Sequence, residues 1–394
     1  MDVMIENKVV PKLRFREFKD DWINLSLGEL LTFKNGLNSD KDKYGSGVRF
    51  INVLDIIENN FITYDKIIGS VEVTKKEFDK NEVVYGDILF QRSSETREDV
   101  GQSNVYLDKN KSAVFGGFVI RGHSKKVYEP VFMNYLLKTW LVRKEITTKS
   151  GGSTRYNVGQ DALSKVVIFS TSISEQKKIA SFLSVVDEKL QKLTKKKELL
   201  SAYKKGVMQR IFSQELCFKD DNGNNYPDWE EKKLGELCDI TTGKSNREDS
   251  SLDGVYTFFD RSEDIRTSSI YLFDGEAVIV AGEGSSFPPK YFKGKFDLHQ
   301  RTYAIMGFKN LFGRYLFYYL HQYKNYFVRY AVGSTVKSLR LPIFNKMNIR
   351  LPSLEEQKKI ANFLSSLDSK IELVSTQIEN TKAFKKGLLQ QMFV

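Results

Sequence analysis

Few residues in this sequence have the types and spacings that catalysis requires. A metal-dependent nuclease of the common kind needs a Pro-Asp pair followed by Glu-x-Lys, which hold a divalent ion and activate water. Pro227-Asp228 precedes Glu230-Glu231-Lys232 too closely and lies in a turn-rich connector. No histidine stands at a metal-ligand spacing from another histidine or from a cysteine. Each is therefore expected to be structural or exposed: His123, His299 and His321. We therefore expect no catalytic residue and no metal site in this chain.

Motifs for nucleotide or base chemistry are also absent. The sequence has no Gly-x-x-x-x-Gly-Lys-Ser/Thr phosphate loop, so no nucleotide-driven motor is expected. Gly282-Glu283-Gly284 lacks the third glycine of a dinucleotide-binding fingerprint. An amino-methyltransferase would carry an Asn/Asp-Pro-Pro-aromatic motif, whereas Pro288-Pro289 stands between Phe287 and Lys290. What remains is a binding function.

The composition favours a polyanionic partner. The 394 residues carry 61 Lys and Arg against 50 Asp and Glu, which gives a formal net charge of +11. Cys217 and Cys238 are too few for a disulfide framework, as expected in a reducing compartment. Because the chain starts without an apolar signal segment and has no run of roughly 18 apolar residues, we expect a cytoplasmic protein that does not enter a membrane.

Polar and basic loops at the ends of expected strands are the candidate DNA contacts. Arg can read guanine, Gln can read adenine, and Glu can accept a hydrogen bond from cytosine. Each of these residues could equally be a solvated loop residue. The candidates in the first half are Gln91, Arg92, Ser93 and Arg155, and those in the second half are Glu283, Ser285, Lys290 and Lys337.

The elements that must position these loops follow the same order in both halves. The first half is expected to have strands at 47–53, 82–90, 118–121 and 166–169 and a helix over 131–145, preceded by an arm up to about Asp20. The second half is expected to have strands at 254–259, 276–280, 301–306 and 347–351 and a helix over 315–330. The many aromatic residues of that last helix are expected to be core, because they recur at helical spacing.

An internal repeat explains this shared order. Glu175-Gln176-Lys177-Lys178-Ile179-Ala180 returns as Glu356-Gln357-Lys358-Lys359-Ile360-Ala361, an offset of 181 residues (356 − 175). The openings of the halves, at Trp22 and Trp229, match at an offset of 207 (229 − 22) instead. The middle of the second half is therefore 26 residues shorter (207 − 181). A frame repeated around a divergent middle predicts two copies of one unit, each with its own variable insert.

Each copy of the repeat ends in a long helix with a heptad seam. The apolar residues alternate at spacings of three and four, which is typical of a coiled coil whose nearest partner is the other copy. Lys197, Lys204, Thr381 and Lys385 interrupt the seam. The residues expected to form the spacer and to dock other subunits are Ile179, Leu183, Val186, Leu190 and Leu193 in the first copy and Ile360, Leu364, Leu367, Ile371 and Val374 in the second.

The chain resembles the specificity subunit of type I restriction-modification systems. The resemblance rests on the repeated Trp and Leu-Gly-Glu-Leu openings (Leu27 to Leu30 and Leu234 to Leu237), on the repeated helix start, and on Gly86-Asp87-Ile88-Leu89. It implies an α+β fold in which two α/β target-recognition domains are separated by an antiparallel pair of long coiled-coil helices, with a pseudo-twofold repeat. The domains expected are 1–172 and 214–353, and the spacer helices 173–213 and 354–394.

The resemblance also implies the partners. Each recognition domain would read one half of a split, asymmetric site in double-stranded DNA, and the helices would dock two methyltransferase subunits. Two motor-nuclease subunits would complete the enzyme. S-adenosylmethionine, ATP and Mg would be bound by these partners, and this chain would bind no cofactor. Two alternatives stay open: a self-contained DNA-modifying enzyme with an unrecognised active site, and a coiled-coil scaffold that binds only protein.

Overall fold

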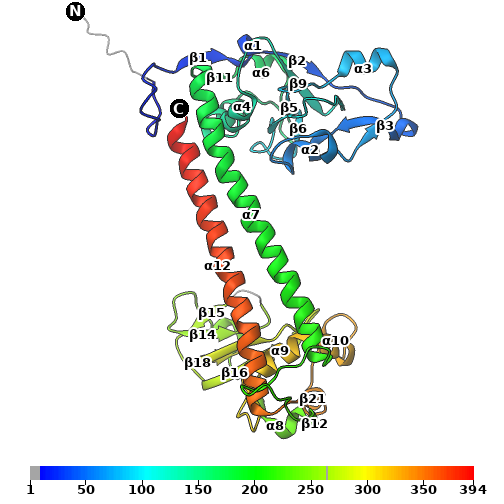
Figure 1. The fold of residues 1–394 in the computed structure, drawn as a ribbon, viewed down its shortest axis with the longest axis vertical. Coiled ribbons are helices and arrows are strands. Elements are labelled where there is room, and N and C mark those ends of the chain that lie inside the picture. The colour runs from blue at the N-terminus through cyan, green and yellow to red at the C-terminus, as the bar shows by residue number, and fades with distance from the viewer. Residues whose placement is uncertain (1–8, 263–264) are drawn as a thin grey trace, which may run out of the picture. The chain divides into compact units, whose positions relative to one another are not determined.

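The computed structural model describes residues 9–262 and 265–394, and the chain divides into two compact units (Figure 1). The first unit comprises Met1–Lys192 and Gln377–Val394, and the second comprises Leu193–Thr376. The two expected long helices are present as α7 (Ile173–Phe212) and α12 (Leu354–Met392). Each unit therefore contains one of the two halves of the sequence together with a part of both long helices. In the described part of the chain, no helix combines the length and apolarity needed to cross a membrane.

The first unit is built on a four-stranded antiparallel sheet in the order β2-β9-β5-β7. These strands are β2 (Leu31–Asn35), β9 (Val119–Ser124), β5 (Ile88–Gln91) and β7 (Ser103–Val105). A smaller sheet joins β3 (Tyr44–Ile51) to β4 (Ser70–Val71) and β8 (Val114–Phe115), and β1 (Ile23–Ser26) pairs with β11 (Val167–Ser170). The short helices are α1 (Leu27–Leu30), α2 (Val53–Ile57), α3 (Lys75–Asn81), α4 (Pro130–Leu136), α5 (Trp140–Thr148) and α6 (Gln160–Ser164).

The second unit repeats this plan around a larger sheet. Six strands pair in the order β13-β19-β16-β18-β14-β15. They are β13 (Asp239–Thr242), β19 (Thr302–Met306), β16 (Phe273–Ala281), β18 (Lys290–Leu298), β14 (Tyr256–Phe259) and β15 (Arg266–Ser268). The β1–β11 ladder has its counterpart in β12 (Glu230–Lys233) and β21 (Asn348–Leu351). The short helices are α8 (Leu234–Leu237), α9 (Gly313–Gln322), α10 (Asn325–Tyr330) and α11 (Leu341–Asn345).

The prediction of one continuous helix at 131–145 was wrong, and so was that at 315–330. The first is split into α4 and α5, because Thr139 adopts an extended backbone and its hydroxyl donates to the carbonyl of Leu136 at 2.7 Å. A threonine side chain that bonds a nearby carbonyl competes with helical pairing. The second is split at Tyr323, whose hydroxyl donates to the carbonyl of Phe212 at 3.2 Å. The aromatic side chains of α9 and α10 do form core, as predicted, with Tyr315, Tyr318, Tyr319 and Phe327 buried.

The core of each unit contains residues from both long helices. In the first unit, Ile179 and Leu183 of α7 share one apolar cluster with Leu388 and Met392 of α12. In the second, Ile211 of α7 shares a cluster with α12 residues such as Leu364. The start of one helix thus packs beside the end of the other in each unit, so the helix segments run antiparallel there (Figure 1). Burial of the seam against the folded domain stabilises helices that propensity alone would leave marginal.

Two of the residues that interrupt the heptad seam attach the helices to their domains. Lys385 of α12 forms an ion pair with Asp187 of α7 at 2.5 Å, and Asp187 accepts a hydrogen bond from the hydroxyl of Tyr135. The second unit contains the equivalent set, in which Lys204 pairs with Asp368 and Tyr318 donates to the same carboxylate. Each lysine also lies over the tyrosine ring, at 5.3 Å and 5.1 Å from its centroid. These two polar interruptions of the seam are therefore filled by hydrogen-bonded charge pairs.

The repeated Glu-Gln at each helix start has a structural role. The side-chain oxygen of Gln176 accepts from the backbone of Glu129, and its nitrogen donates to the carbonyl of Thr171 at 2.7 Å. Gln357 makes the same two kinds of bond, to the backbone of Phe312 and to the carbonyl of Pro352. Each glutamine thereby joins the start of a long helix to a short helix and a strand exit of its own domain. This requirement explains why the motif is the most exact part of the repeat.

The N-terminal arm packs as expected over its described part, whereas residues 1–8 lie outside the described residues. The backbone N–H of Leu13 donates to the carbonyl of Gln391 at 2.8 Å, and Phe15 meets the ring of Phe182 edge to face. In the second unit the connector after α7 makes the corresponding contacts. There Leu216 donates to Arg210, and Phe218 meets Phe363. The arm and the connector thus occupy equivalent places in the two units.

Candidate nucleic-acid interface

The candidate loops of the first unit meet in a two-stranded sheet. The strand β6 (Ser93–Ser94) lies just beyond β5 and pairs antiparallel with β10 (Tyr156–Asn157), which follows the glycine-rich loop at 151–155. The hydroxyl of Ser93 donates to the side-chain oxygen of Asn157 at 2.5 Å. The side-chain nitrogen of Asn157 donates to the carbonyl of Arg155. Arg92, Ser93 and Arg155, which are far apart in sequence, are thus gathered at one place.

The candidate loops of the second unit meet in the same way. The strand β17 (Glu283–Gly284) lies just beyond β16 and pairs antiparallel with β20 (Lys337–Ser338), which follows the second glycine-serine-threonine loop. In this pairing Glu283 lies opposite Ser338, and Lys337 lies opposite Gly284. Ser285 is exposed in the loop that follows β17. The ammonium of Lys290 donates to the carbonyl of Ser262 at 2.6 Å, and that of Lys337 donates to the carbonyl of Val328 at 3.2 Å.

The two small sheets share one backbone frame and carry different side chains. Arg92 donates its backbone N–H to Phe118 and accepts from Val158, at 2.9 and 3.0 Å. Gly282 occupies the equivalent position, donating to Arg301 and accepting from Leu339, both at 2.8 Å. Arg92 in one unit thus corresponds to Gly282 in the other, Phe118 to Arg301, and Ser93 to Glu283. The backbone hydrogen bonds are thus the same in both units, while the side chains at the equivalent positions differ.

The predicted site residues differ in how accessible they are. Arg92, Arg155 and Ser285 are exposed, and Ser93, Glu283, Lys290 and Lys337 are half-buried. Gln91 is buried, with its side-chain nitrogen donating to the carbonyl of Ser93 at 2.9 Å and its side-chain oxygen without a partner among the described residues. In this conformation Gln91 supports the small sheet and does not present its amide to solvent.

Sequence reasoning missed a cluster of arginines beside Glu283. Arg301 was assigned to a strand, but it lies in the turn before β19, where its guanidinium donates to Glu283 at 2.8 Å. Arg247 and Arg261 line the same cavity, and so does His299. Desolvation by burial lowers the pKa of His299, which favours the neutral ring. The signal in the sequence was the pair of basic residues His299 and Arg301 at the start of an expected strand.

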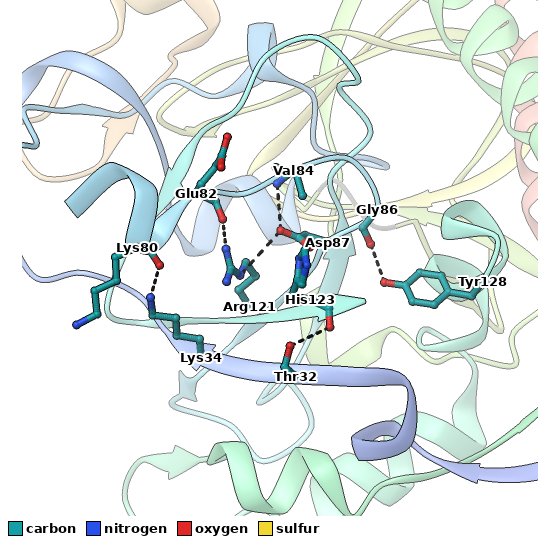
Figure 2. Close-up of polar contacts among 10 residues, drawn as sticks. All are labelled: Thr32, Lys34, Lys80, Glu82, Val84, Gly86, Asp87, Arg121, His123 and Tyr128. Atoms are coloured by element: carbon teal, nitrogen blue, oxygen red, sulfur yellow. Dashed lines mark hydrogen bonds and ion pairs between the residues drawn. The ribbon is translucent and has the colours of Figure 1, made fainter. Parts of the chain in front are cut away.

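The Gly86-Asp87 pair before β5 has a structural role (Figure 2). Asp87 is buried and accepts a hydrogen bond from the backbone of Val84 at 3.0 Å, while the Nδ1 atom of His123 lies 2.7 Å from its other oxygen. Burial raises the pKa of the Asp87 carboxyl. The hydroxyl of Tyr128 donates to the carbonyl of Gly86 at 2.8 Å. These contacts fix the start of β5. The candidate loop with Arg92 and Ser93 follows the other end of this strand.

The seam residues that were expected to dock other subunits are used within the chain. Leu190, Leu193 and Ile371 are half-buried, and the remaining seven are buried: Ile179, Leu183, Val186, Ile360, Leu364, Leu367 and Val374. A protein bound to α7 or α12 must therefore contact other faces of these helices, such as those of the exposed Val185 and Leu373. The docking role of the seam itself stays a prediction.

The described residues offer no cluster for metal chemistry. No group of three or more His, Cys, Asp or Glu side chains in residues 9–262 and 265–394 is arranged to hold a metal ion. Cys217 is exposed and Cys238 is buried, and both are free thiols. The arrangement of strand-end loops is suited to contact with a large polar surface.

Comparisons with known proteins match nearly the whole length of the chain. A putative specificity subunit of the type I restriction enzyme MjaX from Methanocaldococcus jannaschii is 25% identical, over 96% of this chain and 94% of its own length. The specificity subunit of the type I restriction enzyme EcoDI from Escherichia coli is 32% identical, over 41% of this chain and 37% of its own length.

Solved structures share the fold at low sequence identity. The crystal structure of a type I restriction-modification S subunit from M. genitalium has a TM-score of 0.64 at 16% identity, covering 98% of this chain and 99% of that one. A chain from a structural study of complex assembly and conformational transition in a type I system has a TM-score of 0.59 at 15% identity, covering 96% and 99%. The family model of the type I restriction modification DNA specificity domain matches twice, at residues 19–201 and 226–382. With both halves matched, this chain belongs to the family of type I restriction-modification DNA specificity proteins.

Proposed function

We propose that this chain is the DNA specificity subunit of a type I restriction-modification enzyme. Each unit reads one half of a bipartite, asymmetric site in double-stranded DNA, and α7 and α12 space the two readers. The observation that supports this proposal most strongly is the pair of small sheets, β6·β10 and β17·β20, which share a backbone frame and present different side chains. Different groups on one frame are suited to reading different half-sites, because base edges are read by side-chain hydrogen bonds.

The chemistry is assigned to partner subunits. Two methyltransferase subunits, which bind S-adenosylmethionine, dock on the exposed faces of the long helices. Two motor-nuclease subunits, which use ATP and Mg, complete the restriction enzyme. In this arrangement the chain acts without catalytic residues and supplies the sequence recognition. Its formal charge of +11 supports contact with the DNA backbone, whose phosphates dominate affinity and make it dependent on salt.

Incubation of the purified chain with DNA, labelled S-adenosylmethionine and Mg tests whether it needs partners. We expect no methylation and no cleavage by the chain alone, and methylation once the methyltransferase subunits are added. Modification by the chain alone would show that it is itself a DNA-modifying enzyme. Methylome sequencing of the host with and without the gene provides the second test, in which one bipartite N6-methyladenine motif should disappear. An unchanged methylome would contradict the proposed function.

A further inference from the structure

A polar cavity lies beside the small sheet β17·β20 of the second unit. Its volume is about 280 Å³, and its walls carry three guanidinium groups, from Arg247, Arg261 and Arg301. Two carboxylates, Asp260 and Glu283, face the same space. Asp260 is buried and accepts a hydrogen bond from the backbone of Ser262 at 2.7 Å. The cavity is therefore positively charged overall, but it holds acceptor groups as well as donors.

Arg301 lines this cavity and is paired with Glu283. One of its terminal nitrogens donates to Oε1 of Glu283 at 2.8 Å. The side chain of Glu283 is 19% exposed, whereas that of Arg301 is 62% exposed. The backbone N–H of Arg301 donates to Nδ1 of His299 at 3.1 Å, which fixes the turn that carries it. The remaining donors of the guanidinium are therefore oriented by its pairing with a largely buried carboxylate, as specific base contacts require.

Close packing of the backbone keeps the pair in place. Gly282, which precedes Glu283, donates its N–H to the carbonyl of Arg301, and a Cβ atom at this position would lie 2.4 Å from that oxygen. Only glycine allows the strand and the turn to approach so closely. The two side chains of the Arg301–Glu283 pair thus project from adjacent segments that cannot slide apart without breaking this contact.

Arg247 and Arg261 differ from Arg301 in their surroundings. Both are exposed, and neither side chain has a hydrogen-bond or ion-pair partner among the described residues. Unpaired exposed arginines beside a base-reading group are placed to bind phosphates, which position a protein on DNA without reading sequence. A phosphate at Arg301 itself would meet the negative charge of Glu283, which opposes its binding there.

We propose that the Arg301–Glu283 pair reads a G·C base pair in the half-site of the second unit, with Arg247 and Arg261 on flanking phosphates. The guanidinium donates to O6 and N7 of guanine, while the carboxylate accepts from N4 of cytosine, so donors and acceptor match one base-pair edge in the major groove. The first unit has Phe118 and Ser93 at the corresponding positions and cannot form this pair. The inference rests on the proposed function and assigns one specificity to one half of the site.

The test maps the modification motif of the full chain co-expressed with its methyltransferase subunits. The half-site of the second unit is identified as the half that persists when residues 38–150 are exchanged for those of a relative. Arg301→Ala and Arg301→Lys should each reduce the preference for guanine at one position of that half roughly ten- to hundredfold. The other half should not change. Lysine keeps the charge but cannot make the bidentate contact, so a loss in both variants separates geometry from charge.

Matched variants separate base reading from backbone contact. Arg247→Ala combined with Arg261→Ala should lower modification at all sites and flatten its salt dependence, with an unchanged motif. Lys293→Ala, an exposed cation on β18, serves as the control and should change neither. An unaltered motif in both Arg301 variants, or a second half-site without a G·C pair, would overturn the inference. A wild-type complex that produces no bipartite motif would instead overturn the proposed function.

Discussion

Two equivalent glutamates at the starts of the long helices have opposite environments. Glu175 receives two hydrogen bonds from the guanidinium of Arg14, at 2.7 and 2.8 Å. Glu356, at the same position of the repeat, receives one from the indole nitrogen of Trp229 at 3.0 Å. The corresponding indole of Trp22 has no partner among the described residues. The carboxylate of Glu175 is therefore paired with a cation in the first unit, whereas that of Glu356 accepts from a neutral donor in the second.

Exchange of each glutamate for glutamine should affect stability differently. Glu175→Gln leaves the largely buried Arg14 without its counter-ion and should lower the free energy of unfolding by about 3 kcal/mol. Glu356→Gln keeps an acceptor for Trp229 and removes a buried charge, so the change should stay within about 1 kcal/mol. Urea unfolding of the full chain, followed by tryptophan fluorescence, measures both. Equal losses in the two variants would contradict this account.

The stability difference between Glu356→Gln and the wild type should depend on pH, with a sign that follows from the pKa of Glu356. Desolvation raises the pKa of Glu356 above its ordinary value of 4.5. From pH 4.5 up to this raised pKa the folded state binds more protons than the unfolded state, so the contribution of Glu356 to stability falls as pH rises through that window. Glutamine does not titrate. Unfolding of Glu356→Gln at a series of pH values should therefore show an advantage over the wild type that grows from acid towards neutral pH; a constant difference would contradict it.

At the scale of the element, α7 has one face that is buried and one that is exposed to solvent. Leu183 is fully buried among residues of α12 and the first unit, whereas Val185, two positions along, is 62% exposed. The helix turns by about 100° per residue, so neighbouring positions can face core and solvent in turn. The heptad spacing of the sequence predicts this difference without any knowledge of the partner surface.

Aspartate at these two positions should therefore give contrasting results. Leu183→Asp places an unpaired charge in the core and should cost more than about 4 kcal/mol, enough to unfold the first unit. Val185→Asp should change stability by no more than about 0.5 kcal/mol. Limited proteolysis together with thermal unfolding checks both variants. Wild-type resistance in Leu183→Asp would show that α7 does not depend on this core.

At the scale of the whole molecule, each unit has its own apolar core. The clusters around Trp22 and Phe132 and around Tyr315 and Phe344 belong to separate units. A part of each long helix contributes to each core. Independent cores allow one variable insert to be replaced while the other unit keeps its structure, which is consistent with a frame that is repeated and inserts that diverge.

Insert exchange should change one half of the target at a time. Replacement of residues 38–150 by the corresponding insert of a relative should alter only one half of the modification motif, and replacement of 245–331 only the other half. The physical reason is that each pair of reading loops is held by strands of its own unit. Methylome sequencing of cells with each chimera provides the measurement. A change in both halves from a single exchange would show that the units do not read independently.

Local patterns in the sequence were sufficient for some elements and insufficient for others. The strand at 276–280 was predicted from its apolar run, and the structure has β16 at Phe273–Ala281. Its long partner β18, Lys290–Leu298, was missed, because its outer half is charged and glycine-containing and only Phe296 to Leu298 are buried. Arg92 and Arg155 were predicted as contacts from their chemistry and their position in polar loops, and they stay predictions. Arg301 was not among the candidates, because only the folded chain brings it beside Glu283.

The sequence by itself determined the repeat, the two long helices and the class of function, because these depend on periodicity and on residue types along the chain. Only the tertiary structure decided that Lys204 and Lys385 of the seam are paired with aspartates, that Gln91 is turned inward, and that Arg301 shares a cavity with two other arginines. The reason is that hydrogen bonds and charge pairs between distant segments depend on how strands and helices pack. No local pattern of residues specifies that packing.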